Sequence, residues 1–303
     1  MKFLVFSDFH HEPGVFHGTG IEGIRLMQKR AEEEGCDFII QLGDLCHGAE
    51  FVADFVKEYN DFHIPSYHAL GNHDAEFTSF EDTLKYYNMP AEYYYFDNGG
   101  YRIIVMNPNY YYEDGEYTRF SLANWLQHNA ARDHIPPEQL AWLEKTIADS
   151  PYPCIIMSHQ SFERVDGVKN RQAVLDIINA ANQRKKHSVL MCINGHYHRD
   201  NIRILDGVCY FDVNSASIDW IDKKHHCYPD EMHEQIRKLG HLVVFEKPLY
   251  AIVTLEGTTI DIKGSSSEML CGVTYKDAAG TEGYDRCGRK FTQYIQSANI
   301  TLG

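Results

Sequence analysis

Residues Lys2–His10, KFLVFSDFH, form a hydrophobic run that ends in a carboxylate and an imidazole. Four later runs, DFIIQL, PSYHAL, PCIIM and SVLMCIN, also lead into polar side chains. The polar groups that follow them are Gly43-Asp44, Gly71-Asn72-His73-Asp74, Ser158-His159 and Gly195-His196-Tyr197-His198. Parallel strands end at a common edge of their sheet, and ligand-binding residues gather there. The pattern therefore predicts a parallel sheet with one site along its edge.

Helical patterns lie between these runs. Apolar residues recur at helical spacing within 21–34, 51–59, 80–87, 137–147 and 174–181. Gly35 is placed to end the first helix, Ser79 to cap the third, and Pro136-Pro137 to begin the fourth. Strands that alternate with helices require crossover connections and a mostly parallel sheet.

Short strands with tight turns are predicted after Asn194, at 207–214, 241–247, 249–255 and 258–263. They indicate a second, more antiparallel sheet packed on the first. We therefore expect an α/β fold, a two-sheet sandwich flanked by helices. A catalytic domain would span 1–264, and 265–303 would be a C-terminal extension, which could be a tail, an edge hairpin or a cover over the site. Because late strands often become sheet edges that invite pairing, residues 241–303 could also form a homodimer.

Composition narrows the function. The 303 residues are 44% hydrophobic, which is enough for a full core. The net charge of −15 makes a nucleic-acid partner improbable, although bound cations can supply local positive charge for phosphate chemistry. Eight cysteines without a C-x-x-C pair favour a reducing compartment, and we expect a cytoplasmic protein. No signal peptide or membrane-spanning segment is predicted, so no membrane partner is expected.

The polar strand ends carry enough donors for two metal ions. Asp8 and His10, like His196 and His198, are two residues apart. In an extended chain both side chains of a pair would share one face and grip one site. The remaining donors are the two oxygens of Asp44, which could bridge two cations, the neutral amide oxygen of Asn72 and the imidazole of His159. Such mixed donors suit Mn, Fe or Zn better than Mg or Ca.

The motifs DFH, GD, GNHD, SH and GHYH, in this order and spacing, resemble those of the calcineurin-like metallophosphoesterase superfamily over about residues 1–215. The resemblance implies one metal ion held by Asp8, His10, Asp44 and His198, and another held by Asp44, Asn72, His159 and His196. It also implies that His73 contacts the phosphate or leaving group. Asp74 would then orient His73 through a ring nitrogen.

The implied function is hydrolysis of a phosphodiester or phosphomonoester by in-line attack of a hydroxide that bridges two metal ions. His73 would act as general acid or hydrogen-bond donor. The motifs resemble the group that contains class III cyclic nucleotide phosphodiesterases and small phosphatases, so the substrate is a small phosphate ester and could be a nucleotide. The alternative is a catalytically silent scaffold for protein interaction, although all seven ligand positions and His73 are present.

Two further features leave alternatives open. Many members continue the second motif as G-D-x-x-D, whereas this chain reads Gly43-Asp44-Leu45-Cys46-His47. His47 could cap the following helix, or it could change the hydrogen bonding around the site or reach the substrate. Tyr110-Tyr111-Tyr112, expected in a long polar loop, could stack a nucleobase, but packing against the sheet rim is favoured.

Two other motifs are set aside. His225-His226-Cys227 is interpreted as a solvated loop because charged residues surround it. Gly18–Gly23 matches G-x-G-x-x-G but begins well after the end of the first strand, so no nicotinamide cofactor is expected.

Overall fold

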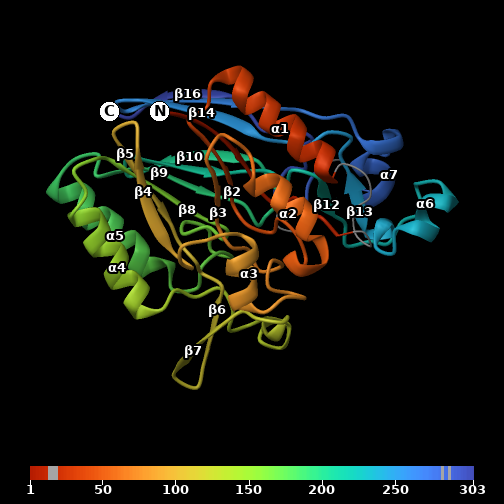
Figure 1. Ribbon diagram of the computed structural model, residues 1–303, viewed down its shortest axis with the longest axis horizontal. Helices are drawn as coiled ribbons and strands as arrows, with labels where there is room; N and C mark the ends of the chain where they lie inside the picture. The colour runs from red at the N-terminus through yellow and green to blue at the C-terminus, as the bar shows by residue number, and fades with distance from the viewer. Residues whose placement is uncertain (13–19, 281–282, 286–287) are drawn as a thin grey trace.

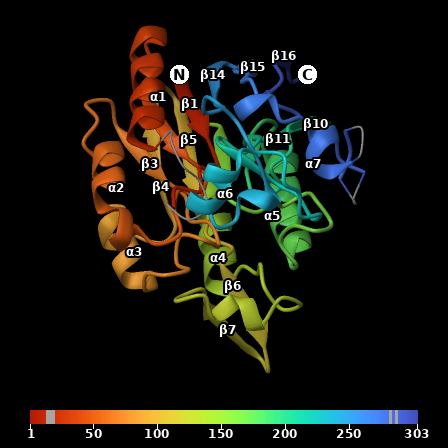
Figure 2. The same cartoon turned by 90° about the vertical axis from the view of Figure 1, so that its right-hand side faces the viewer.

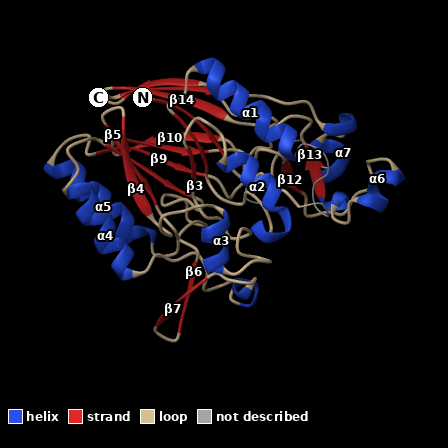
Figure 3. Cartoon of the chain, viewed as in Figure 1, coloured by secondary structure: helices blue, strands red, loops and turns tan. Residues whose placement is uncertain are grey.

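Two six-stranded mixed sheets form the centre of the protein, with helices outside them (Figures 1 and 3). The computed structural model describes residues 1–12, 20–280, 283–285 and 288–303; Gly18, Thr19 and Cys287 lie outside this part. The first sheet contains, in spatial order, β16 (Ala298–Thr301), β15 (Thr259–Gly264), β14 (Ala251–Glu256), β1 (Lys2–Phe6), β2 (Phe38–Gln41) and β3 (Ser66–His68). The second contains β10 (Asn201–Leu205), β11 (Val208–Asp212), β9 (Val189–Asn194), β8 (Cys154–Ser158), β5 (Tyr101–Val105) and β4 (Tyr94–Asn98). The predicted α/β two-sheet sandwich is confirmed.

Helices α1 to α5 lie where the sequence pattern places them, whereas α6 and α7 were not predicted. The longer ones are α1 (Gly20–Glu34), α2 (Ala53–Asn60), α4 (Pro137–Ala148) and α5 (Arg171–Arg184). Shorter ones are α3 (Phe80–Tyr86), α6 (Asp230–Gln235), α7 (Tyr275–Ala279) and the 3₁₀ turns η1 (Ala49–Val52), η2 (Asn124–Gln127), η3 (Leu239–His241) and η4 (Leu270–Gly272). The Ser79 hydroxyl caps α3 by accepting from the Asp82 amide, as expected. No helix of the described part is long and apolar enough to cross a membrane.

The five motif-bearing strands are divided between the two sheets, which corrects the prediction that one sheet holds them all. β1, β2 and β3 are parallel neighbours in the first sheet, whereas β8 and β9 are parallel neighbours in the second. The late strands are shared too, because β14 pairs antiparallel with β1 and β11 pairs parallel with β9. A strand buried on both faces is apolar throughout, so its pattern does not specify which strands will be its neighbours.

Alternation along each strand builds the layers. Phe3 and Val5 of β1 face the core between the sheets, while Leu4 and Phe6 pack with residues of α1 and α2 on the outer face. β8 repeats the arrangement, with Ile156 facing α4 and α5. In Figure 2, α1, α2 and α3 lie on one side of the strands and α5 on the other. The order helix, sheet, sheet, helix buries both faces of each sheet.

The C-terminal segment is part of the core. Phe291, Ile295 and Leu302 join the cluster between the sheets, and β16 forms the edge of the first sheet next to β15. Removing this segment would expose buried apolar surface. The domain boundary at residue 264 stays a prediction.

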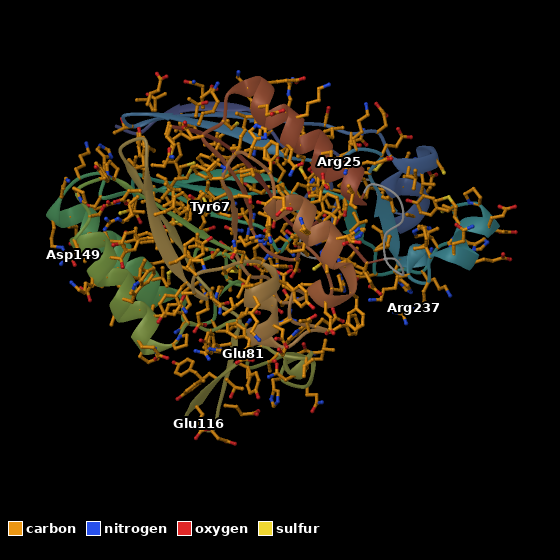
Figure 4. All side chains as sticks on the ribbon, viewed as in Figure 1. Arg25, Tyr67, Glu81, Glu116, Asp149 and Arg237 are labelled. Carbon is orange, nitrogen blue, oxygen red and sulfur yellow. The ribbon has the colours of Figure 1, made fainter. Side chains whose placement is uncertain are left out.

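The tyrosine run at 110–112 is a strand and not the loop that we predicted. β6 (Tyr110–Glu113) and β7 (Glu116–Arg119) form a hairpin that projects from the body (Figure 1), with Glu116 labelled in Figure 4. Tyr111 stacks on His128 at 4.1 Å between ring centroids, and Tyr112 packs on Tyr117 at 4.5 Å. These contacts favour the packing interpretation over nucleobase stacking. A further two-stranded sheet joins β12 (Ile218–Trp220) to β13 (Leu242–Val244).

His68, at the end of β3, is buried, and its hydrogen bonds allow a test of the packing around the first sheet. Its Nδ1 accepts from Gln41 Nε2 at 3.0 Å, its Nε2 donates to Asn60 Oδ1 at 2.7 Å, and its ring stacks on Tyr87. Burial lowers the pKa of His68 from its ordinary value of 6.5 to about 3. The folded protein therefore keeps His68 neutral while the unfolded chain takes up a proton, so stability is lost as the pH falls below 6.5.

We predict that wild type loses about 2 kcal/mol more stability than His68→Gln between pH 7 and pH 5. Urea unfolding of both proteins at the two pH values measures the difference. Equal pH dependence in the two proteins would contradict a neutral, buried His68.

Candidate metal centre

The carboxyl ends of the two sheets meet at one end of the sandwich, and hydrogen bonds join their loops. The Asp8 amide donates to the Gly43 carbonyl at 3.0 Å within the first sheet's loops. Between the sheets, the His196 amide donates to Asp8 Oδ2 at 2.9 Å, and His159 Nδ1 lies 2.8 Å from the Leu42 carbonyl oxygen. The expected meeting of the five motifs therefore occurs, although it takes two sheets to make it.

Six of the candidate ligands gather in two groups. The donor atoms of Asp8, His10 and His198 lie within 4.8 Å of one another, and so do those of Asp44, His159 and His196. In the first group, His198 Nε2 is 3.2 Å from Asp8 Oδ1 and 3.0 Å from His10 Nε2. In the second, His159 Nε2 is 3.1 Å from Asp44 Oδ2 and 3.2 Å from His196 Nδ1. Asp44 Oδ2 also lies 3.9 Å from His10 Nε2, so this carboxylate stands between the groups.

The donor atoms fit bound cations. His159 and His198 each hold Nδ1 against a main-chain carbonyl, at 2.8 and 2.9 Å, which leaves a lone pair on each Nε2 facing the centre. Asp8 Oδ1 and Asn72 Oδ1 are buried without a hydrogen-bond partner among the described residues. Facing lone pairs and carboxylate oxygens in a dry interior repel one another unless positive charge lies between them. Nitrogen and oxygen donors in this mixture suit transition-metal ions.

The charges of the centre also favour bound cations. Burial alone would lower the pKa of His159, but Asp44 and Asp8 raise it to about 10. Burial and the neighbouring His159 lower the pKa of His196 to about 3. The two carboxylates therefore demand positive charge, and a metal ion would take the place of the proton on His159.

The backbone at the donors is left-handed, which corrects the expectation of extended strand ends. Five of the seven candidate ligands have positive φ: Asp8 (54°), His10 (50°), Asp44 (52°), His196 (73°) and His198 (52°). As a result His196 and His198 face different donor groups. They do not hold one site together, as an extended chain would make them do. The division between two groups is the one that the family resemblance implied. Each such conformation costs on the order of 1 kcal/mol or more, and clusters of them are typical of functional sites.

Asp74 has a different role from the one predicted. Its carboxylate accepts the main-chain amides of Gly71 (2.7 Å), Asp44 (3.0 Å), Leu45 (2.9 Å) and Cys46 (3.3 Å), and the Tyr87 hydroxyl (2.6 Å). The predicted contact between Asp74 and the His73 ring is wrong. Asp74 instead ties the second motif loop to the third and so fixes the position of Asp44.

His73 is oriented by Glu76, which sequence reasoning missed. His73 Nδ1 is 2.5 Å from Glu76 Oε2, and the His73 side chain is 20% exposed. Burial works against a charge on His73, but Asp44 and Glu76 raise its pKa above the ordinary value. The signal that could have identified Glu76 is a carboxylate three residues after the candidate acid, in a chain whose second motif lacks the usual Asp.

His47 takes part in the hydrogen bonding around the site, and the capping alternative is wrong. The residue before η1 is Gly48, and no side chain caps that turn. His47 Nε2 lies 2.8 Å from His10 Nδ1, and His47 Nδ1 lies 3.0 Å from Glu76 Oε2. His47 thus contacts both a candidate metal ligand and the carboxylate that orients His73.

A cavity of about 410 Å³ opens beside the GHYH loop. His196, His198 and Arg199 form one wall. Trp220 also lines the cavity, and its ring lies 5.8 Å from that of His10. The C-terminal segment contributes Tyr284, Arg289 and Phe291. A cover over the site was one alternative that the sequence left open for this segment, but the segment has no metal-binding motif that would mark which of its residues line the cavity.

The His225-His226-Cys227 stretch stands apart from the centre. His225 Nε2 is 2.9 Å from the Leu242 carbonyl oxygen, and His226 Nε2 is 2.7 Å from Asp230 Oδ1. Among the described residues, none of the donor clusters includes either histidine. His226 and Cys227 are exposed, as expected of a solvated loop, but His225 is buried and the interpretation is wrong for that residue.

The close packing around Gly195 leads to a testable prediction about metal affinity. A Cβ at Gly195 would overlap Ser7 Oγ and come within 2.5 Å of Asp8 Oδ2. We expect Gly195→Ala to push Asp8 out of its group and to weaken Mn²⁺ binding roughly 10-fold or more, as loss of ligand orientation does elsewhere. Titration of metal against a chelator measures the affinity.

Gly257→Ala is the control for that variant. Gly257 also has positive φ, 62°, but nothing lies within 4 Å of its added Cβ. The control should lose about 1 kcal/mol of stability through backbone strain and keep its metal affinity. Equal metal affinity in both variants would show that packing at Gly195 does not set the position of Asp8.

Comparisons with known proteins agree with this geometry. A dimetal phosphatase from Danio rerio aligns over 100% of this chain and 99% of its own, with 15% identity and a TM-score of 0.64. GAP50, the anchor in the inner membrane complex of Plasmodium, aligns over 100% of this chain and 89% of its own, with 13% identity and a TM-score of 0.50. At these identities the likeness shows a shared fold alone. No curated protein matched the chain.

The sequence itself carries the family assignment. The family model for calcineurin-like phosphoesterases matches residues 1–200, which contain all seven candidate ligands and His73. That match spans well over half of the chain. The chain belongs to the calcineurin-like phosphoesterase family.

Proposed function

We propose that this protein is a dinuclear metal-dependent hydrolase of small phosphate esters. The observation that carries the proposal is the position of Asp44, which belongs to the donor group of His159 and His196 and lies 3.9 Å from His10 of the other group. A bridging carboxylate between two sets of imidazole and carboxylate donors is the arrangement that a two-metal phosphoesterase needs.

Each metal ion would have its own ligands. Asp8, His10, Asp44 and His198 would hold one; Asp44, Asn72, His159 and His196 would hold the other. Two ions of the Mn, Fe or Zn type, when bound, supply Lewis-acid activation of water and neutralise charge on the phosphoryl oxygens. The Asn72 oxygen, buried and without a partner among the described residues, supports its place in the second set.

His73 is the proposed proton donor. Its Nδ1 is held by Glu76, so the other ring nitrogen, Nε2, remains for the substrate. The ring lies beside His10, at 5.2 Å between centroids, and the side chain is partly exposed. His73 can therefore reach a phosphate at the metal centre and protonate the departing oxygen.

The cavity beside the centre sets the size of the substrate. A volume of about 410 Å³ suits a small molecule. Trp220 offers a flat apolar surface there, which supports a nucleotide among the candidate esters. The net charge of −15 disfavours a long nucleic acid. Both diesters and monoesters fit these features.

The cysteines and the edge of the first sheet support a proposed location and oligomeric state. The seven cysteines of the described part are free thiols, which supports a reducing, cytoplasmic location. The edge strand β16 presents an unpaired side to solvent and supports the proposal of a homodimer through residues 241–303.

The alternative is a silent scaffold. GAP50 shares the fold and is an anchor by description, so the fold alone does not require catalysis. The complete donor set of this chain argues against the alternative.

Hydrolysis of bis-p-nitrophenyl phosphate and p-nitrophenyl phosphate by Mn²⁺-loaded protein tests the proposal. We expect turnover of at least one ester and loss of turnover on chelation. His73→Ala should lower kcat roughly 100-fold or more on the corresponding phenyl esters, the usual contribution of a general acid, and less on the p-nitrophenyl esters, whose good leaving group needs little proton donation. The preferred ester distinguishes a phosphodiesterase from a phosphatase.

His226→Ala is the matched control, because His226 is exposed and stands outside the donor groups. It should retain wild-type turnover. A wild type that binds fewer than two equivalents of metal and hydrolyses neither ester would support the scaffold instead.

A further inference from the structure

Glu76 contacts two histidines of different function. Its Oε2 lies 2.5 Å from His73 Nδ1 and 3.0 Å from His47 Nδ1. The His47 and His73 rings stack with centroids 4.4 Å apart and planes at 29°, so their Nδ1 atoms reach the same carboxylate oxygen side by side. The far side of His47 contacts His10, with 2.8 Å between His47 Nε2 and His10 Nδ1. A continuous line of polar contacts therefore runs from His73 through Glu76 and His47 to a candidate metal ligand.

The charge on Glu76 determines which ring nitrogen carries a hydrogen in each histidine along this line of contacts. An ionised carboxylate only accepts, and its charge favours hydrogen on the ring nitrogens nearest to it, so both Nδ1 atoms carry hydrogen. His73 Nδ1 is hydrogen-bonded to Glu76, whereas His47 Nδ1 approaches the same oxygen to 3.0 Å without an aligned hydrogen bond among the described residues. A neutral His47 with hydrogen on Nδ1 has a lone pair on Nε2, and it accepts from His10 Nδ1. His10 then has its own lone pair on Nε2, the atom that lies 3.0 Å from His198 Nε2 and 3.8 Å from Asp8 Oδ1. That is the tautomer in which His10 can bind a metal ion.

The burial of the group makes this arrangement rigid. The His47 side chain is 0% exposed and that of Glu76 is 11% exposed. Burial alone would raise the pKa of Glu76, but contacts with His47 and His73 lower it well below the ordinary value, so Glu76 stays ionised. A buried carboxylate is costly to leave without donors, and these two imidazoles supply them.

We propose that Glu76 is a positioning residue with two effects. It fixes the orientation of the proton donor His73, and through His47 it favours the metal-binding tautomer of His10. The inference rests on the proposed function and deepens it. His47 occupies the place where many relatives have the second Asp of G-D-x-x-D. In this chain the carboxylate is that of Glu76, in the loop after His73. His47 lies between this carboxylate and His10 and contacts both.

The two effects of Glu76 concern different processes, proton donation by His73 and metal binding by His10. His73 gives the Nε2 proton to the leaving oxygen as the phosphorus–oxygen bond breaks, while its Nδ1 hydrogen stays on the ring and faces Glu76. His10 takes no part in that transfer. Loss of Glu76 should therefore weaken both proton donation and metal binding, whereas loss of His47 should weaken metal binding alone.

Metal affinity tests the branch through His47. Competition between the full-length protein and a chelator for Mn²⁺ should show binding roughly 10- to 100-fold weaker in Glu76→Gln and in His47→Phe, the usual effect of losing an outer hydrogen-bond partner. His73→Ala should keep wild-type affinity. Glu81→Gln is the matched control, since Glu81 is exposed on α3, five residues from Glu76, and is labelled in Figure 4. Circular dichroism confirms that each variant is folded.

Leaving-group dependence tests the branch through His73. At saturating Mn²⁺, kcat is measured on aryl phosphate esters whose phenols differ in pKa. A badly oriented proton donor harms esters with poor leaving groups most. We expect Glu76→Gln to lower kcat for phenyl esters roughly 10-fold more than for p-nitrophenyl esters, with little change in KM. His47→Phe should retain the wild-type dependence.

Three outcomes would overturn the proposal. Glu76→Gln could show wild-type affinity and wild-type leaving-group dependence. His47→Phe could alter the leaving-group dependence as strongly as Glu76→Gln does. Wild type could bind three equivalents of metal and Glu76→Gln two, which would make the His47, His73 and Glu76 cluster a metal site of its own. If wild type hydrolyses no ester, the proposed function fails, but the chelator competition still decides whether Glu76 and His47 orient His10.

Discussion

The buried carboxylates of Asp8 and Asp44 set the main constraint on this structure. Two negative groups in a dry interior need positive charge beside them, and four imidazoles converge on them. That convergence requires loops from two different sheets to approach within hydrogen-bonding distance. The left-handed backbone at five donors accompanies that convergence, as strained conformations do at functional sites.

The strain in these loops is offset by the interactions around them. Asp74 accepts four main-chain amides and so holds the loop of Asp44 against the loop of His73. Ser215 and Ser217 donate their hydroxyls to the carbonyls of Asp8 and Phe9, at 2.7 and 2.6 Å. None of these groups is a candidate metal ligand, yet each keeps one in place. A left-handed conformation persists only where the surroundings determine it in this way.

The donors of the centre were predictable from the sequence, because each follows an apolar run at a strand end and the residue types have few other uses together. The pairing of the strands was not. β8 and β9 read like β1 and β2, since all four are buried on both faces, and only the assembled core separates them into two sheets. The positive φ values also escaped prediction, as none of the five residues is glycine. The part of the cavity wall formed by Tyr284, Arg289 and Phe291 depends on tertiary contacts that no local pattern encodes.

Glu76 and His47 show why a motif is an incomplete description of a site. At the end of the second motif a carboxylate is replaced by an imidazole, which by itself would remove an acceptor. The structure supplies another acceptor from the loop after His73 and places the imidazole between it and His10. An anion beside neighbouring histidines is therefore present in this chain, although it comes from another part of the sequence. Since the two changes lie 29 residues apart in sequence and meet only in the fold, neither is intelligible alone.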